Sequence, residues 1–130
     1  MIPLSDKAAT RKGLKDKLDA IARTRCFMRD SVAAGRAVPC QRCGNNNVEW
    51  AHVISRRDLS LRWELDNNLS LCHSCHVWFD AHRKEARAWF ASRWPERWEH
   101  IQKIWWQRDK MFGSSVEHLK ELLAQMKGLR

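Results

Sequence analysis

Four cysteines could do chemistry together, because they form two Cys-x-x-Cys pairs, Cys40 with Cys43 and Cys72 with Cys75. Each tight pair can present two sulfurs to one ion, and four thiolates suit tetrahedral Zn²⁺. A site whose four ligands all come from protein is closed, so it is structural and not catalytic. The alternatives are four unrelated cysteines or an iron–sulfur cluster. We therefore predict a structural zinc site that displays the long segment between the pairs.

The residues around these pairs resemble the HNH endonuclease family, whose core is a ββα-metal fold. The resemblance covers about residues 38–82 and rests, besides the cysteines, on three stretches: Ala51-His52-Val53-Ile54, Asp66-Asn67-Asn68-Leu69 and Leu71-Cys72-x-x-Cys75-His76. It implies that His52, Asn67 and His76 are the three residues named by the family's letters. The pattern Ala-His-x-x-Ser-Arg-Arg is similar to that of small HNH proteins encoded by bacteriophages and prophages.

Cleavage of a phosphodiester needs an activated water, neutralisation of the phosphate and a stabilised leaving oxygen. His52 lies on the predicted strand 48–54, and a neutral imidazole can take a proton from water at physiological pH, so we predict it as the general base. His76 and Asp80 are four residues apart on a predicted helix and project from one face. That pair suits Mg²⁺, Mn²⁺, Zn²⁺ or Ni²⁺. The alternatives are a strand-face histidine and an ordinary surface pair.

Asn67 is expected to bond backbone groups and fix the loop opposite His52. The family's spacing of five residues to the first cysteine of the pair favours Asn67 over Asn68, and the other interpretation is a turn asparagine. Many HNH enzymes carry a metal ligand immediately before the base, where this chain has Ala51. His73 and His82 are the candidate substitutes for that ligand.

The chain carries 24 Lys and Arg against 15 Asp and Glu, a net charge of +9. Such an excess favours a polyanionic partner such as nucleic acid. Arg56, Arg57 and Arg62, on the loop after His52, are predicted to contact the phosphate backbone, which would give salt-dependent binding with little sequence readout. The alternative is a set of solvated loop arginines.

We expect one domain, 1–130, of a mostly helical α+β class: a basic N-terminal helix within 5–36, the HNH core in 37–82 and a helical extension in 83–130. Helical patterns predict a first helix over 5–34 capped by Ser5, Pro95 in the first turn of a later helix, and a capping box from Ser114 to Glu117 before the last one. The tryptophans at helical spacing, such as Trp94, Trp98 and Trp105, are expected to be mostly core residues.

No stretch looks like a signal peptide or a membrane span. We therefore expect a cytoplasmic protein, in the host cytoplasm if it is phage-encoded, where paired cysteines indicate metal more often than disulfides. Cys26, the unpaired cysteine, is expected to be a buried structural thiol.

The resemblance implies a divalent-metal-dependent endonuclease that nicks or cuts double-stranded DNA with limited sequence specificity. It also suggests a role in phage genome processing or packaging, with terminase or portal proteins as partners. The main alternative is a non-catalytic, zinc-stapled DNA-binding module of the same fold. A protein-interaction subunit with a tryptophan docking surface is a third interpretation. The sequence gives no oligomeric state.

Overall fold

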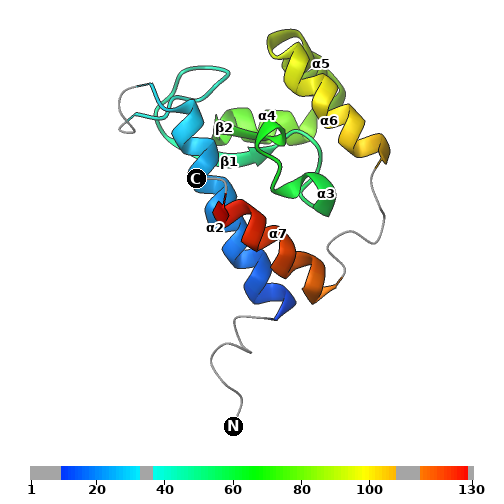
Figure 1. Ribbon diagram of the computed structural model, residues 1–130. Helices are drawn as coiled ribbons and strands as arrows, with labels where there is room; N and C mark the ends of the chain where they lie inside the picture. The colour runs from blue at the N-terminus through cyan, green and yellow to red at the C-terminus, as the bar shows by residue number, and fades with distance from the viewer. Residues whose placement is uncertain (1–9, 33–36, 108–114, 129–130) are drawn as a thin grey trace.

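The computed structural model describes residues 10–32, 37–107 and 115–128, drawn in colour in Figure 1. The first half of the chain contains α2 (Arg11–Asp30), β1 (Val48–His52), α3 (Leu59–Arg62), the 3₁₀ turn η1 (Leu65–Asn67) and β2 (Asn68–Cys72). The second half contains α4 (His73–Ala81), α5 (Arg83–Arg93), α6 (Pro95–Gln107) and α7 (Val116–Gly128). The mostly helical α+β class expected from the sequence is therefore confirmed.

Helix α2 runs from Arg11 to Asp30, within the predicted 5–34; the predicted cap Ser5 lies outside the described residues. Thr10 is its N-cap, and the Thr10 hydroxyl accepts a hydrogen bond from the Gly13 N–H at 3.0 Å. The buried residues of α2 recur every four positions and form one apolar stripe: Leu14, Leu18, Ala22 and Cys26. Cys26 is fully buried, as predicted, and burial raises the pKa of its thiol to about 11.

Strands β1 and β2 form an antiparallel pair in which His52 lies opposite Asn68 and Ala51 opposite Leu69. Successive side chains of a strand point to opposite faces. Ala51 and Leu69 therefore face one side of the sheet, where they join the core formed with α4, α5 and α6. Trp50 and Ser70 face the other side, where Trp50 packs on the core of α2 and α7 and Ser70 meets Cys26.

This two-stranded sheet thus lies between two helical layers. Helix α4 covers one face, with the α5–α6 pair beyond it, and α2 covers the other face with α7 alongside (Figure 1). Helices α2 and α7 are far apart in sequence and lie side by side, since Leu119, Leu123 and Met126 of α7 complete the apolar core that α2 begins. The described residues thus form two small cores on either side of the sheet: a first core with α4, α5 and α6, and a second core with α2 and α7.

A buried ion pair joins the end of α2 to the middle layer. The Arg29 guanidinium donates to the backbone carbonyls of Leu65 and Asn68, each at 2.6 Å, and pairs with Asp30 at 2.9 Å. The Asp30 carboxylate in turn accepts from the Ser70 N–H at 3.1 Å. These bonds satisfy backbone groups at the start of β2 and hold that strand in place.

The C-terminal helices follow the predicted pattern closely. Pro95 is the first residue of α6, as expected. Ser114 lies outside the described residues, and the hydroxyl that accepts the His118 N–H in front of α7 belongs to Ser115. Trp94 and Trp98 pack as partly buried residues against Phe90 of the first core, with ring centroids 5.2 and 6.3 Å away. Across the described ranges, no helix combines the length and the apolar character that crossing a membrane requires.

Candidate functional site

The four paired cysteines meet at one end of the sheet. Cys40 and Cys43 flank a tight turn before β1, where the Gly44 N–H donates to the Cys40 carbonyl at 2.9 Å and Gly44 adopts a positive φ of 84°. Cys72 ends β2 and Cys75 lies in the first turn of α4. All four Sγ atoms lie within 4.8 Å of one another.

This cluster fits a structural metal ion better than disulfides. All four cysteines are free, and Cys43 Sγ lies 3.5 Å from Cys72 Sγ, far beyond a disulfide length of about 2.05 Å. Sulfurs bound to one tetrahedral zinc at about 2.3 Å are about 3.8 Å apart. Hydrogen bonds from the Ser74 hydroxyl and the Cys75 backbone N–H lower the pKa of the Cys72 thiol to about 6, which favours its thiolate, whereas burial raises the pKa of the Cys75 thiol to about 12. The four cysteines can therefore hold an ion such as Zn²⁺.

A basic side chain lies directly beside these sulfurs. Arg42 Nη1 donates to Cys75 Sγ at 3.5 Å, and the guanidinium carbon lies 3.7 Å from the centre of the Trp78 ring. Four thiolates on one divalent ion leave two negative charges, and Arg42 is placed to offset part of that charge. The ring fixes the guanidinium by a cation–π contact.

A second polar group forms on the exposed face where β1 meets α4. His76 Nδ1 lies 2.8 Å from Glu49 Oε1, and His73 Nδ1 lies 3.2 Å from Glu49 Oε2. His76 Nε2 lies 3.6 Å from Asp80 Oδ2. The structure thus brings together the two predicted metal ligands, His76 and Asp80, with His73 and with an acid that sequence reasoning had missed.

Glu49 determines which nitrogen of His76 is free. A carboxylate only accepts hydrogen bonds, so His76 donates through Nδ1 and keeps its lone pair on Nε2, the nitrogen that faces Asp80. Two ligand atoms on one ion at about 2.1 Å are roughly 3 to 3.5 Å apart, close to the observed separation. The His76 hydrogen bond, with a smaller opposing effect of desolvation, lowers the pKa of Glu49. His76 Nε2 and Asp80 Oδ2 are thus two neighbouring atoms of the kind that ligate divalent ions.

His52 lies on the other face of the sheet. It shares that face with Trp50, whose ring centre is 4.4 Å from its own, and its side chain is only 9% exposed. Its Nε2 is 2.9 Å from the Arg62 carbonyl, an acceptor, so Nε2 carries the proton. Among the described residues no group bonds Nδ1. Burial, with the neighbouring Arg56 and Arg62 charges, lowers the pKa of His52 to about 4.

Asn67 and Asn68 are both fully buried, and their side chains hold the loop that follows His52. Asn67 accepts from the Ile54 N–H at 2.8 Å and donates to the Ile54 and Leu61 carbonyls at 3.1 and 3.0 Å. Asn68 donates to the Arg62 carbonyl at 3.1 Å, the same oxygen that His52 contacts. Asn67 therefore makes the backbone bonds expected of it, and the residue nearest His52 is Asn68.

The predicted site residues accordingly fall into two groups. His76 and Asp80 lie on the α4 face, whereas His52 and the asparagines lie around the loop on the α2 side, so strand alternation does not bring His52 next to His76. His82, the other candidate ligand, is the exposed C-cap of α4 and joins neither group.

No protein-family model matches this chain, and no curated protein or solved structure matches it. The roles of these residues are therefore judged from their geometry.

The three loop arginines differ in how free they are. Arg62 is held by Asp19 through two bonds, from Nε at 2.9 Å and from Nη2 at 2.6 Å, and its side chain is 14% exposed. This arrangement argues against the phosphate contact predicted for Arg62, because the guanidinium is already neutralised inside the protein. Arg56 lies 3.6 Å from the same carboxylate but is 58% exposed, and Arg57 is exposed.

A further acidic group lies between η1 and α6. Glu64, Asp66 and His100 each place one ligand atom within 4.8 Å of the others. His100 Nδ1 is 2.6 Å from Asp66 Oδ2, while Arg97 Nε lies 3.9 Å from the second Asp66 oxygen. Since the guanidinium already supplies positive charge, we interpret this group as an ion-pair network that attaches α6 to η1.

Proposed function

We propose that this protein is a divalent-metal-dependent endonuclease of the HNH type that hydrolyses DNA phosphodiester bonds. The observation that carries the proposal is the exposed group of Glu49, His76 and Asp80, in which an imidazole nitrogen and a carboxylate oxygen lie 3.6 Å apart with a carboxylate behind the imidazole. The order strand, strand, helix around it and the cysteine cluster beside it also agree with the resemblance seen in the sequence.

In this proposal the protein's own residues hold and orient the reactants. A divalent ion bound by His76 and Asp80 would neutralise the scissile phosphate and stabilise the leaving oxygen. Glu49 keeps His76 in the tautomer whose Nε2 is free, as carboxylates behind metal-binding histidines commonly do. The face is open to a large substrate, because Glu49 and Asp80 are both about half exposed, 45% and 51%.

We assign His52 as the general base on the family resemblance, although a pKa of about 4 makes it a weaker base than a free imidazole. The Arg62 carbonyl holds the proton on Nε2, so Nδ1 has the lone pair, and a pKa of about 4 keeps the ring neutral at physiological pH. His52 and His76 lie on opposite faces of the sheet, and Val53 and Ile54, which follow His52, are buried in the core. The resemblance, and not the geometry of the site, therefore supports this assignment.

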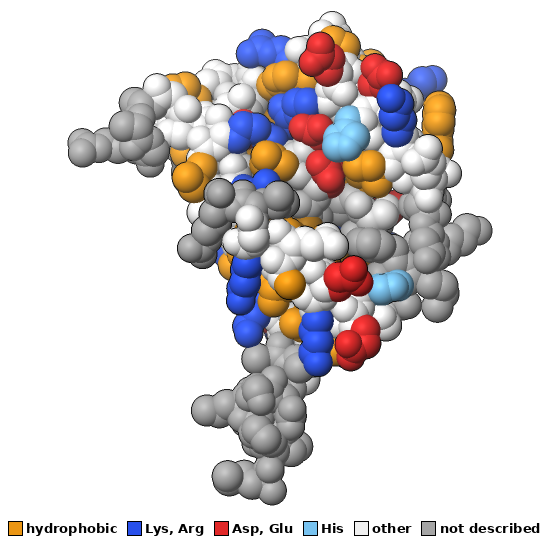
Figure 2. Space-filling view, viewed as in Figure 1, with side chains coloured by type: hydrophobic (Ala, Val, Ile, Leu, Met, Phe, Trp, Pro, Cys, Tyr) orange, Lys and Arg blue, Asp and Glu red, His pale blue; other side chains and the backbone are white. Residues whose placement is uncertain are grey.

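The DNA backbone would be held by the free cations. Arg56 and Arg57 are exposed beside His52, and Lys and Arg side chains are spread over α2 and over the upper helices on the face drawn in Figure 2. With a net charge of +9, binding should weaken steeply with added salt. A cytoplasmic setting and phage genome processing or packaging, with terminase or portal proteins as partners, complete the proposal.

A supercoiled-plasmid assay with Mg²⁺, Mn²⁺, Ni²⁺ and Zn²⁺ tests this function. We expect nicking that His76→Ala abolishes, that Glu49→Gln lowers about 10- to 100-fold, and that His52→Ala lowers about 100-fold or more. His82→Ala, on the same helix end but outside the group, is the matched control and should keep full activity. Undiminished nicking by His76→Ala would remove the proposed metal site.

The second candidate is a non-catalytic, zinc-stapled DNA-binding module. The burial of His52 on the opposite face, together with Ala51 where many HNH enzymes have a metal ligand, favours it. This candidate predicts salt-sensitive DNA binding, a zinc ion at the four cysteines and no cleavage with any of the four ions. The plasmid assay separates the two functions directly.

A further inference from the structure

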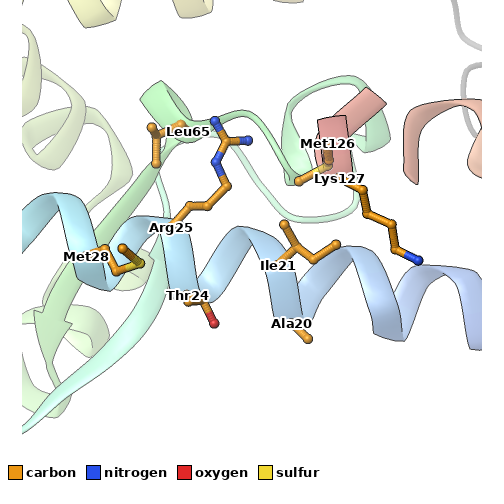
Figure 3. A pocket seen from close by; sticks show the side chains of 8 residues that line it. All are labelled: Ala20, Ile21, Thr24, Arg25, Met28, Leu65, Met126 and Lys127. Atoms are coloured by element: carbon orange, nitrogen blue, oxygen red, sulfur yellow. The ribbon is translucent and has the colours of Figure 1, made fainter. Parts of the chain in front are cut away.

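A largely apolar cavity of about 740 Å³ lies between α2, η1 and the end of α7, away from both groups described above. Figure 3 shows its walls: Ile21 and Met28 from α2, Leu65 from η1, and Met126 from α7. The cavity is open to solvent on the side of Met28, which is 69% exposed. The volume is within the range of roughly 300 to 1,000 Å³ typical of binding pockets.

A second cavity of about 260 Å³ continues the first along η1 and α7. The two cavities share Arg25, Leu65 and Met126, so together they form one groove between α2 and α7. Glu64 borders the smaller cavity, but its carboxylate faces His100 at 3.8 Å. A groove of this form, with apolar anchors and two helical walls, suits the apolar face of a helix.

In the part of the chain that the structure describes, the two cations of the groove have no acidic partner. Arg25 is partly buried and extends from α2 between Leu65 and Met126 (Figure 3). Within residues 10–32, 37–107 and 115–128 no carboxylate pairs with Arg25, nor with the exposed Lys127 across the groove. A carboxylate from a partner could therefore pair with Arg25 and with Lys127 at this groove. Arginine in such surroundings is also typical of binding hot spots.

We propose that this groove docks an acidic amphipathic helix of a partner protein. Leucine-like side chains of that helix would fill the space between Ile21, Met28 and Met126, and its carboxylates would pair with Arg25 and Lys127. A nucleic-acid backbone fits less well, since most of the lining is apolar and a phosphate chain offers nothing to bury there. The proposal is independent of the nuclease function, because none of these residues lies in the metal or base groups.

Methyl NMR on the full-length, zinc-loaded protein tests the groove. The probe is a synthetic helix of about four turns, ~14 residues, made of leucine and glutamate with the leucines on one face; the comparison probe has lysine in place of glutamate. We expect the glutamate peptide to shift the methyl signals of Ile21, Met28 and Met126 saturably. Arg25→Glu should weaken its binding about tenfold or more, and Met28→Glu should also weaken it. Arg23→Glu, an exposed change on the same helix, should leave binding within about twofold of wild type.

Several results would overturn the docking groove. These are no methyl shift with the glutamate peptide, equal binding of the lysine peptide, or an equal loss with Arg23→Glu and Arg25→Glu. Identical shifts produced by duplex DNA that competes with the peptide would assign the groove to nucleic acid instead.

Discussion

The burial of His52 makes a quantitative prediction about stability and pH. The folded protein holds the His52 pKa at about 4, whereas an unfolded chain has a histidine pKa of about 6.5. Between pH 6.5 and pH 4 His52 is protonated in the unfolded state but not in the folded state, so the unfolding free energy decreases as the pH falls. Well above pH 6.5 His52 is neutral in both states and contributes no pH dependence. Integrated from pH 7 to pH 5, this one group should cost about 2 kcal/mol of unfolding free energy.

The perturbation is His52→Gln, whose side chain can still donate to the Arg62 carbonyl but cannot titrate. Urea denaturation of zinc-loaded protein at steps from pH 7 to pH 5 should show wild type losing about 2 kcal/mol more than the variant. The comparison cancels changes that both proteins share, including any at the cysteine cluster. In parallel, the ring C–H signals of His52 should not shift over this range by NMR.

A His52 signal that titrates near pH 6.5, or equal pH slopes for the two proteins, would refute this reasoning. Either result would mean that water reaches the imidazole freely. The inference that the Arg62 carbonyl fixes a buried, neutral, Nε2-protonated ring would then fail.

Three further predictions follow from the packing. Asn67→Ala removes three buried hydrogen bonds and should lower the unfolding free energy by about 3 kcal/mol in urea denaturation. The exposed control Asn46→Ala should lower it by less than about 0.5 kcal/mol. Similar losses for the two variants would contradict the structural role of Asn67. Asp19→Asn should cost about 2 kcal/mol at pH 7. Desolvation opposes ionisation of Asp19, but the bonds from Arg62 and Trp63 outweigh it and lower the pKa of Asp19. The stability that they give is lost as the pH falls through that lowered pKa, so the gap between variant and wild type should narrow at acidic pH below the ordinary carboxyl pKa of about 3.9. Cys72→Ser, or a strong chelator, should release the zinc, as measured by elemental analysis, and should make thermal unfolding less cooperative. An unchanged melting curve would show that the cysteines bind no stabilising ion.

Local spacing explains what could be predicted from the sequence. A Cys-x-x-Cys pair closes within one turn, and Pro95 fixes its own backbone angle, so both features appeared where expected. The backbone bonds of Asn67 were expected from the family resemblance, whose spacing to the cysteines favoured Asn67 over Asn68.

The features that were missed depend on contacts between distant segments. Glu49 looked like an ordinary strand acid, and becomes significant only when α4 packs on its face; its position two residues before Ala51, on the same side of the strand, was the available signal. The sequence predicted a DNA contact for Arg62, because its partner Asp19 is distant in the sequence, on α2, and the pairing appears only in the folded chain. Strand alternation places His52 and His76 on opposite faces of the sheet. The family resemblance, in contrast, implied that both histidines belong to one site.

The pairing of α2 with α7 also has a consequence for the order in which the molecule forms during translation. Helix α2 leaves the ribosome first, but the leucines that cover its apolar stripe come from the last described helix. The sheet, α4 and the cysteines between them are synthesised in one continuous stretch and can assemble early. The sheet can cover part of the stripe of α2 early, but the part that packs on α7 stays uncovered until synthesis reaches α7, and a chaperone or a neighbouring chain has that interval in which to bind it.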